Sequence, residues 1–181
     1  MSAFTSEDEL DWRRIDVAGI VTHAGIASVR ETELEDCLRW LAAEKYDVAR
    51  LDVAGGFREI RRQLGEMFSW SAQFGYQLDD GSEVPPNLDA LRDGFGFAAS
   101  PSERRVLSLG RMESLWNLDP NWAAGFLAIA AEYSRIQLAV GRRFLTVVAL
   151  PEGSSLVGAR FESLVIPYFG WDARVTETVA G

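Results

Sequence analysis

The sequence has little of the chemistry on which most enzymes depend, because it holds one histidine (His23), one cysteine (Cys37) and one lysine (Lys45). Most hydrolytic and transfer mechanisms need a base that titrates near neutral pH, usually histidine. His23 has no Ser or Cys nucleophile motif near it, and one Cys with one His cannot build a zinc site. The leucine-rich surroundings of Cys37 predict that it packs in a core. We therefore predict a protein that is not an enzyme and that needs no cofactor or metal.

Long hydrophobic runs are also missing. No apolar segment approaches the roughly 20 residues that a membrane-spanning helix needs, and residues 1–11 are acidic and polar, unlike a secretory signal. These features predict a cytoplasmic protein. The 181 residues are 48% hydrophobic and 25% charged, which suits one globular domain with its own core. The chain has no repeat, low-complexity tract or Pro/Ser-rich linker, so we predict a single domain over residues 1–181.

Positive charge is scarce relative to negative charge. The chain has 27 acidic and 18 basic residues, for a net charge of −9. Phosphate binding needs concentrated Lys and Arg, so this balance disfavours nucleic acid and anionic membranes as direct ligands. It favours a basic partner, although net negative charge also serves solubility alone.

The hydrophobic patterns predict strands that alternate with helices. The predicted strands are 15–23, 48–53, 104–109 and 144–150, and the predicted helices are about 28–43, 57–68, a short one from 87, and 120–140. Segment 144–150 is a nearly continuous apolar run, which is typical of a buried parallel strand. We therefore predict an α/β fold, with a parallel sheet covered by helices. The tail, residues 151–181, either adds one or two edge strands or covers a sheet face.

The most informative stretch begins at Asn87, which is a good helix N-cap and follows a long irregular loop over 69–86. Asp89 and Asp93 are four residues apart, so both project from one face of this helix. Like charges at that spacing cost a few tenths of a kcal/mol. The N-terminal helix dipole stabilises Asp89 by about 0.3–1 kcal/mol, but it does less for Asp93. Asp93 therefore indicates either a solvated face or a cationic partner.

A metal site is the alternative explanation for these carboxylates. Asp79, Asp80 and Glu83 in the preceding loop would extend the cluster, and divalent cations prefer oxygen ligands. The chain lacks the D-x-D-x-D-G spacing of a calcium loop. A carboxylate-based metal-dependent enzyme is therefore the less favoured hypothesis.

The motif Asn87-Leu88-Asp89-Ala90-Leu91-x-Asp93 resembles the hallmark of the barstar family, intracellular protein inhibitors of small secreted ribonucleases. The order of predicted elements over residues 48–150 is similar to that family as well. The resemblance implies a barstar-like parallel sheet packed with helices. Residues 1–47 would then add an extra strand-helix unit at a sheet edge, and 151–181 would form a C-terminal extension.

The resemblance also implies a function: an inhibitor or immunity protein whose loop and short helix plug the active site of a basic nuclease, either a ribonuclease or a nuclease toxin. Asp93 would be the principal anchor and Asp89 the second, because carboxylates replace substrate phosphate in a cleft lined by cations. The full set of implied partner-binding residues is Asp93, Asp89, Asn87, Arg92, Tyr76, Asp80 and Gly96.

Three departures from the family pattern bear on that function. Arg92 stands where the family commonly has an aromatic residue, and it either repels a basic cleft or pairs back to Asp89. The loop is longer, so the usual Tyr-Gly element is displaced to Phe74-Gly75-Tyr76. In the long helix, Ile136 occupies a position where a relative has an acidic contact, with Glu132 one turn away. A barstar-like module that binds a non-nuclease partner is therefore the second hypothesis.

Overall fold

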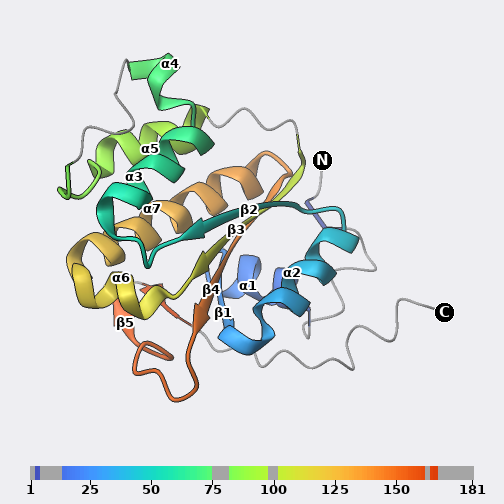
Figure 1. Cartoon of the computed structure of the whole chain (residues 1–181). Coiled ribbons are helices and arrows are strands. Elements are labelled where there is room, and N and C mark those ends of the chain that lie inside the picture. The colour runs from blue at the N-terminus through green and yellow to red at the C-terminus, as the bar shows by residue number, and fades with distance from the viewer. Residues whose placement is uncertain (1–2, 5–13, 75–81, 98–101, 162–163, 167–181) are drawn as a thin grey trace.

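A computed structural model describes residues 3–4, 14–74, 82–97, 102–161 and 164–166. Its centre is a sheet of four parallel strands in the order β1-β4-β3-β2 (Figure 1). The strands are β1 (Ile26–Arg30), β2 (Asp47–Asp52), β3 (Arg104–Gly110) and β4 (Arg143–Leu150). The predicted α/β fold class is therefore confirmed.

Helices cover both faces of this sheet (Figure 1). The smaller core lies under α1 (Ile15–Thr22) and α2 (Leu34–Ala43), and a 3₁₀ turn, η1 (Glu31–Glu33), leads into α2. The larger core lies under α3 (Gly56–Met67), α5 (Leu88–Phe97), α6 (Met112–Leu118) and α7 (Pro120–Ala139). A one-turn helix, α4 (Trp70–Phe74), follows α3. The candidate site on α5 therefore belongs to the larger core.

Strand β4 connects the two cores. All eight of its residues are buried, as its continuous apolar sequence predicts for a central parallel strand. Phe144 and Val148 point into the larger core, whereas Leu145 and Val147 point into the smaller one. Because β4 pairs with both β1 and β3, it joins the N-terminal part of the chain to the rest of the sheet.

The predicted strand at 15–23 is wrong, because this segment is the helix α1. Its run of buried residues resembles a strand, but here every position from Ile15 to Ile20 is buried, including Asp16 and Gly19. A helix buried on nearly all sides has no polar face, so its period is hidden in the sequence. The edge strand that the N-terminal region supplies is β1, which follows α1 and pairs with β4.

The helix predicted at about 28–43 begins only at Leu34, because residues 28–30 belong to β1 and pair with β4, and residues 31–33 form η1. The remaining predicted elements lie close to the expected bounds. Helix α7 begins as predicted, with Pro120 at its first turn and the Asp119 carboxylate accepting the Trp122 N–H at 2.9 Å. Helices α4 and α6 were not predicted, and α4 lies within the segment 69–86 that was expected to be an irregular loop. The described part of the tail does not extend the main sheet, because β5 (Arg160–Phe161) and β6 (Leu164–Val165) pair with each other. Within the same residues, no helix has the length and apolar character that crossing a membrane requires.

Candidate functional site

The start of α5 is held at two points. The Asn87 side chain accepts the Asp89 N–H at 2.7 Å, so Asn87 caps the helix as its sequence predicts. Immediately before it, the buried Trp122 indole donates to the Pro86 carbonyl at 2.7 Å. Because Trp122 belongs to α7, the loop that leads into α5 is tied directly to the long helix. The first turn of α5 therefore has a fixed position.

The inner face of α5 is packed without spare room. Leu91 and Phe95 are 0% and 2% exposed and belong to the larger core. Gly94 lies so close to its neighbours that a Cβ atom there would be 2.6 Å from the Trp70 indole nitrogen and 2.9 Å from the Phe68 ring. The helix is thus a rigid support for whatever its outer face presents.

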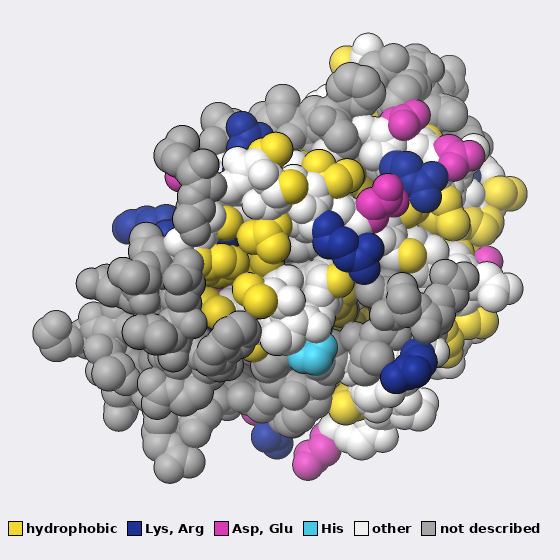
Figure 2. Space-filling view, turned by 180° about the vertical axis from the view of Figure 1, so that it is seen from behind, with side chains coloured by type: hydrophobic (Ala, Val, Ile, Leu, Met, Phe, Trp, Pro, Cys, Tyr) yellow, Lys and Arg dark blue, Asp and Glu magenta, His cyan; other side chains and the backbone are white. Residues whose placement is uncertain are grey.

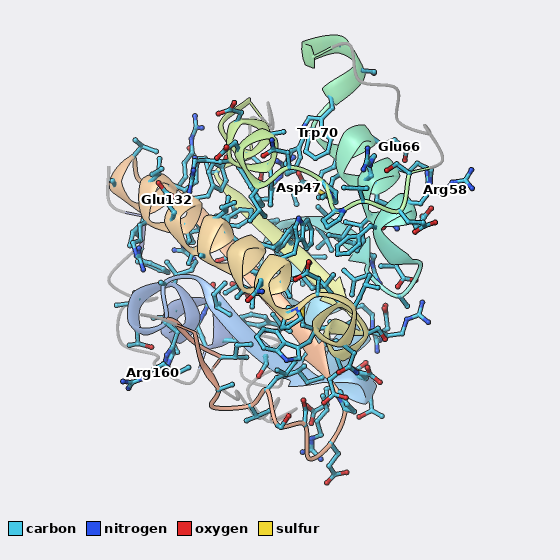
Figure 3. The ribbon with its side chains drawn as sticks, turned by 90° about the vertical axis from the view of Figure 1, so that its left-hand side faces the viewer. Asp47, Arg58, Glu66, Trp70, Glu132 and Arg160 are labelled. Carbon is cyan, nitrogen blue, oxygen red and sulfur yellow. The ribbon has the colours of Figure 1, made fainter. Side chains whose placement is uncertain are left out.

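The outer face of α5 carries Asp89, Arg92 and Asp93, all of which are exposed. Arg92 donates to the Asp89 carboxylate at 3.4 Å and to the Glu132 carboxylate of α7 at 3.3 Å. Figure 3 shows Glu132 on α7, on the side that carries α5. Of the two possibilities for Arg92, the pairing back to Asp89 is therefore the one that the structure contains, and Glu132 shares it.

Asp93 differs from Asp89, because no described residue forms an ion pair or hydrogen bond with its carboxylate. Three carboxylates and one guanidinium give this group a net charge of −2. The Arg92 pairs are solvent-exposed, with 85% of the Asp89 side chain and 50% of the Glu132 side chain accessible, so each adds little to stability. The group is therefore available for contact with a partner, and Asp93 is the carboxylate in it that has no ion-pair partner among the described residues.

The exposed face of α7 continues this surface with apolar groups. Ile136, one helical turn after Glu132, is 53% exposed, and Val140 is 61% exposed. Figure 2 shows acidic and basic side chains lying next to one another over part of the molecule, and apolar side chains exposed around the one histidine. The surface near α5 and α7 is thus charged and apolar, rather than acidic throughout.

Four of the predicted partner-binding residues, Asn87, Asp89, Arg92 and Asp93, lie together at the start and on the outer face of α5. Gly96 belongs to the last turn of the same helix. Tyr76 and Asp80 lie outside the described residues. Glu132 was not among the partner-binding residues predicted from the sequence. Its position on the long helix, one turn from Ile136, was the feature that could have indicated a role in this surface.

Metal binding receives no geometric support within the described ranges, where no three His, Cys, Asp or Glu side chains lie close enough to hold an ion. Asp79, like Asp80, is outside those ranges, whereas Glu83 faces a hollow of about 320 Å³ beside Arg58, Glu59 and Arg62. Cys37 is fully buried, as predicted, and burial raises the pKa of its thiol to about 12. A thiol with such a pKa is not a nucleophile at neutral pH.

A scan against family models and searches of curated proteins and solved structures found no match to this chain.

Proposed function

We propose that this protein is an inhibitor or immunity protein that blocks the active site of a basic, RNase-like nuclease through α5 and the loop before it. The observation that carries the proposal is the arrangement of Asp93. It is exposed on a helix that Asn87 caps and Phe95 anchors, and no described residue neutralises it. A fixed carboxylate of this kind suits a pocket that evolved to hold a phosphate.

The physical argument concerns desolvation. A nuclease cleft presents several cationic donors to substrate phosphate, and a carboxylate placed there accepts charge-assisted hydrogen bonds away from water. Because α5 is already ordered, docking it costs little conformational entropy. The chain's net charge of −9 would also steer a cationic nuclease toward this protein before contact.

The element order over β2 to β4 also supports the proposal. These three strands are adjacent in the sheet, and the helices between them all contribute to the larger core. This order includes the one that the barstar resemblance implies for residues 48–150, with α4 and α6 as additional helices.

The test is inhibition of a panel of small basic microbial ribonucleases by the full-length protein and by Asp93→Asn. We expect inhibition by the wild type, a loss of at least about tenfold in affinity for the variant, and weakening of binding with salt. The matched control is Glu31→Gln, which removes an exposed carboxylate from η1 at another edge of the sheet. An equal loss in both variants would show that Asp93 has no special role.

A partner that is not a nuclease is the second candidate, and one observation favours it. Arg92 lies within the carboxylate group, and Ile136 is exposed one turn from Glu132, so the surface is less acidic and more apolar than its carboxylates alone would make it. Failure of the wild type to bind any ribonuclease of the panel would move the assignment to this candidate.

A further inference from the structure

The sheet has two outer strands, β1 and β2, and their free edges differ in exposure. Within the described residues, β1 pairs with β4 alone and β2 pairs with β3 alone. Strand β1 is covered, because residues 26–29 are each at most 1% exposed. Strand β2 reaches the surface, where Asp47, Arg50 and Asp52 are exposed, and Figure 1 shows it at one side of the sheet between α2 and α3. The free edge of β2 is therefore the edge that a further strand can reach.

Two contacts show which residues of β2 direct their backbone groups away from β3. The Asp52 N–H donates to the Gln63 side-chain oxygen at 2.9 Å, and the Gln63 amide donates to the Asp52 carbonyl at 3.1 Å. Just before β2, the Tyr46 N–H donates to the Leu41 carbonyl at 3.0 Å. Successive residues of a strand face its two neighbours alternately, so the even-numbered positions of β2 face the free edge.

Val48 and Arg50 are the two positions of this edge that lie between the two contacts. No described residue bonds the backbone N–H or C=O of either one on the side away from β3. The Arg50 side chain is directed to α2, where it donates to the Glu35 carboxylate at 2.9 Å. The edge is thus closed at both ends, and it presents two N–H donors and two C=O acceptors between them.

This set of donors and acceptors matches a second copy of the same edge. When two β2 strands run antiparallel about a two-fold axis at Ala49, Val48 of each copy faces Arg50 of the other. Each facing pair exchanges two hydrogen bonds, so every open backbone group is satisfied. Ala49 then faces its counterpart in the closer type of pair, with Cα atoms about 4.5 Å apart, where a small uncharged side chain fits. A register with Arg50 opposite itself would instead bring like charges together.

The charges around this edge also permit two copies to approach each other. Three carboxylates there each pair with a guanidinium of the same chain: Asp47 with Arg105, Glu35 with Arg50, and Asp52 with Arg111. These six charges sum to zero, although the whole chain carries −9. Repulsion between two copies is therefore weaker at this edge than the net charge alone indicates.

We propose that this protein forms a weak two-fold dimer, in which the β2 edges of two copies pair and join two four-stranded sheets into one. The assembly stops at the dimer, because pairing occupies both β2 edges and the β1 edges are covered. The contact is small, so we expect a dissociation constant on the order of 10–1,000 µM. This proposal does not depend on the proposed function, because α5 contributes no residue to this edge.

The first experiment combines sedimentation equilibrium with amide NMR spectra of the full-length protein from about 10 µM to about 1 mM. We expect a monomer–dimer equilibrium without larger species, and shifts at the Val48 and Arg50 amides that grow with concentration. Added salt should strengthen the dimer, because it screens the repulsion between two acidic chains. A monomer at every concentration would overturn the proposal, as would shifts confined to the surface of α5 and α7.

The second experiment compares Arg50→Pro with the matched control Arg50→Gln at high salt. Proline lacks the N–H that the dimer needs, and it is tolerated on an edge strand where that N–H faces solvent. Glutamine removes the same guanidinium but keeps the N–H. We expect the proline variant to dimerise at least about tenfold more weakly than the wild type, and the glutamine variant to stay within about threefold of it.

Equal dimerisation of a folded Arg50→Pro protein would overturn the proposal. Equal losses in the two variants would overturn it as well, because the guanidinium rather than the backbone would then hold the copies together. If Arg50→Pro fails to fold, the concentration dependence of the wild-type Val48 and Arg50 amides decides the matter.

Discussion

The Arg92 guanidinium on α5 lies 3.3 Å from the Glu132 carboxylate on α7, so a cation in the candidate binding surface is shared between two helices. The same guanidinium lies 3.4 Å from Asp89. Arg92 is thereby held among carboxylates of its own chain, which limits the repulsion that it would otherwise exert on a basic partner. Asp93, one residue further along α5, is left as the carboxylate that a partner can neutralise.

Replacing Arg92 by alanine should therefore change association more than stability. The substitution makes the local charge more negative, so the association rate with a basic nuclease should rise by roughly twofold to tenfold at low salt, and less at high salt. The free energy of unfolding should change by less than about 1 kcal/mol, because the pairs are exposed. Stopped-flow binding and urea unfolding measure the two quantities. A slower association at low salt would show that Arg92 contacts the partner favourably.

The buried Asp16 carboxylate differs from the exposed carboxylates that pair with Arg92, because its ion pairs are shielded from water. Asp16 is 0% exposed and lies 3.0 Å from Arg14 and 3.4 Å from Arg143, and the Tyr46 hydroxyl donates to it at 2.9 Å. Asp16→Asn removes the buried carboxylate that Arg14 and Arg143 both contact, so we expect a loss of about 3–5 kcal/mol in the free energy of unfolding.

The matched control for Asp16→Asn is Asp36→Asn, which breaks an exposed pair with Arg39 on α2. That change should cost less than about 1 kcal/mol. Urea unfolding at neutral pH compares the two variants directly. Similar losses in both would mean that burial of the Asp16 cluster contributes nothing beyond an ordinary surface pair.

The parts of the fold that the sequence predicts well are those with one dominant local signal. Strand β4 is a continuous apolar run, and α7 has an Asp-Pro start at Asp119. The prediction of a strand at 15–23, where the structure has α1, was wrong because all six positions from Ile15 to Ile20 are buried. No polar face therefore marks the helical period in the sequence. A helix shows its period in the sequence only when burial leaves a contrast between its faces, whereas a short buried strand is recognised by its apolar run.

The candidate site also has some features that the sequence predicts and one contact that it does not. The Asn87 cap and the shared face of Asp89 and Asp93 follow from spacing within one helix. The Arg92–Glu132 contact joins residues that are 40 positions apart, and it depends on how α5 packs against α7. No single-sequence pattern encodes that distance, so tertiary structure was needed to place Glu132 in the surface.

Alkaline pH should destabilise the protein through two buried neutral groups. Burial raises the pKa of the Cys37 thiol to about 12, and burial followed by the nearby Asp16 charge raises the pKa of the Tyr46 hydroxyl. Both groups are protonated in the folded protein while the unfolded chain releases its protons from about pH 8.5 to 10 upward. Their stabilising contribution is therefore complete below that range and is lost as pH rises through the folded pKa values.

Urea unfolding between pH 7 and about pH 11 should show this decline for the wild type. Cys37→Ala should lose some stability at pH 7 because it removes buried volume, but its stability should fall less steeply above about pH 8.5. A control series in high salt separates this effect from general charge repulsion. Parallel curves for the two proteins would exclude Cys37 as a source of the pH dependence.

The close packing of Gly94 links the stability of the fold to the candidate site. A Cβ atom there would lie 2.6 Å from the Trp70 indole nitrogen and 2.9 Å from Phe68, both of which are buried in the core. Gly94→Ala should therefore reduce the free energy of unfolding by about 1–3 kcal/mol through overpacking. Gly110→Ala is the matched control, because no heavy atom lies within 4 Å of its added Cβ, and we expect a change within about 0.5 kcal/mol. Because the clash would displace α5 or the Phe68 and Trp70 side chains beneath it, Gly94→Ala should also weaken partner binding, whereas Gly110→Ala should not. Thermal unfolding and nuclease inhibition measure both effects, and a Gly94→Ala protein of wild-type stability would show that α5 is packed more loosely than its contacts indicate.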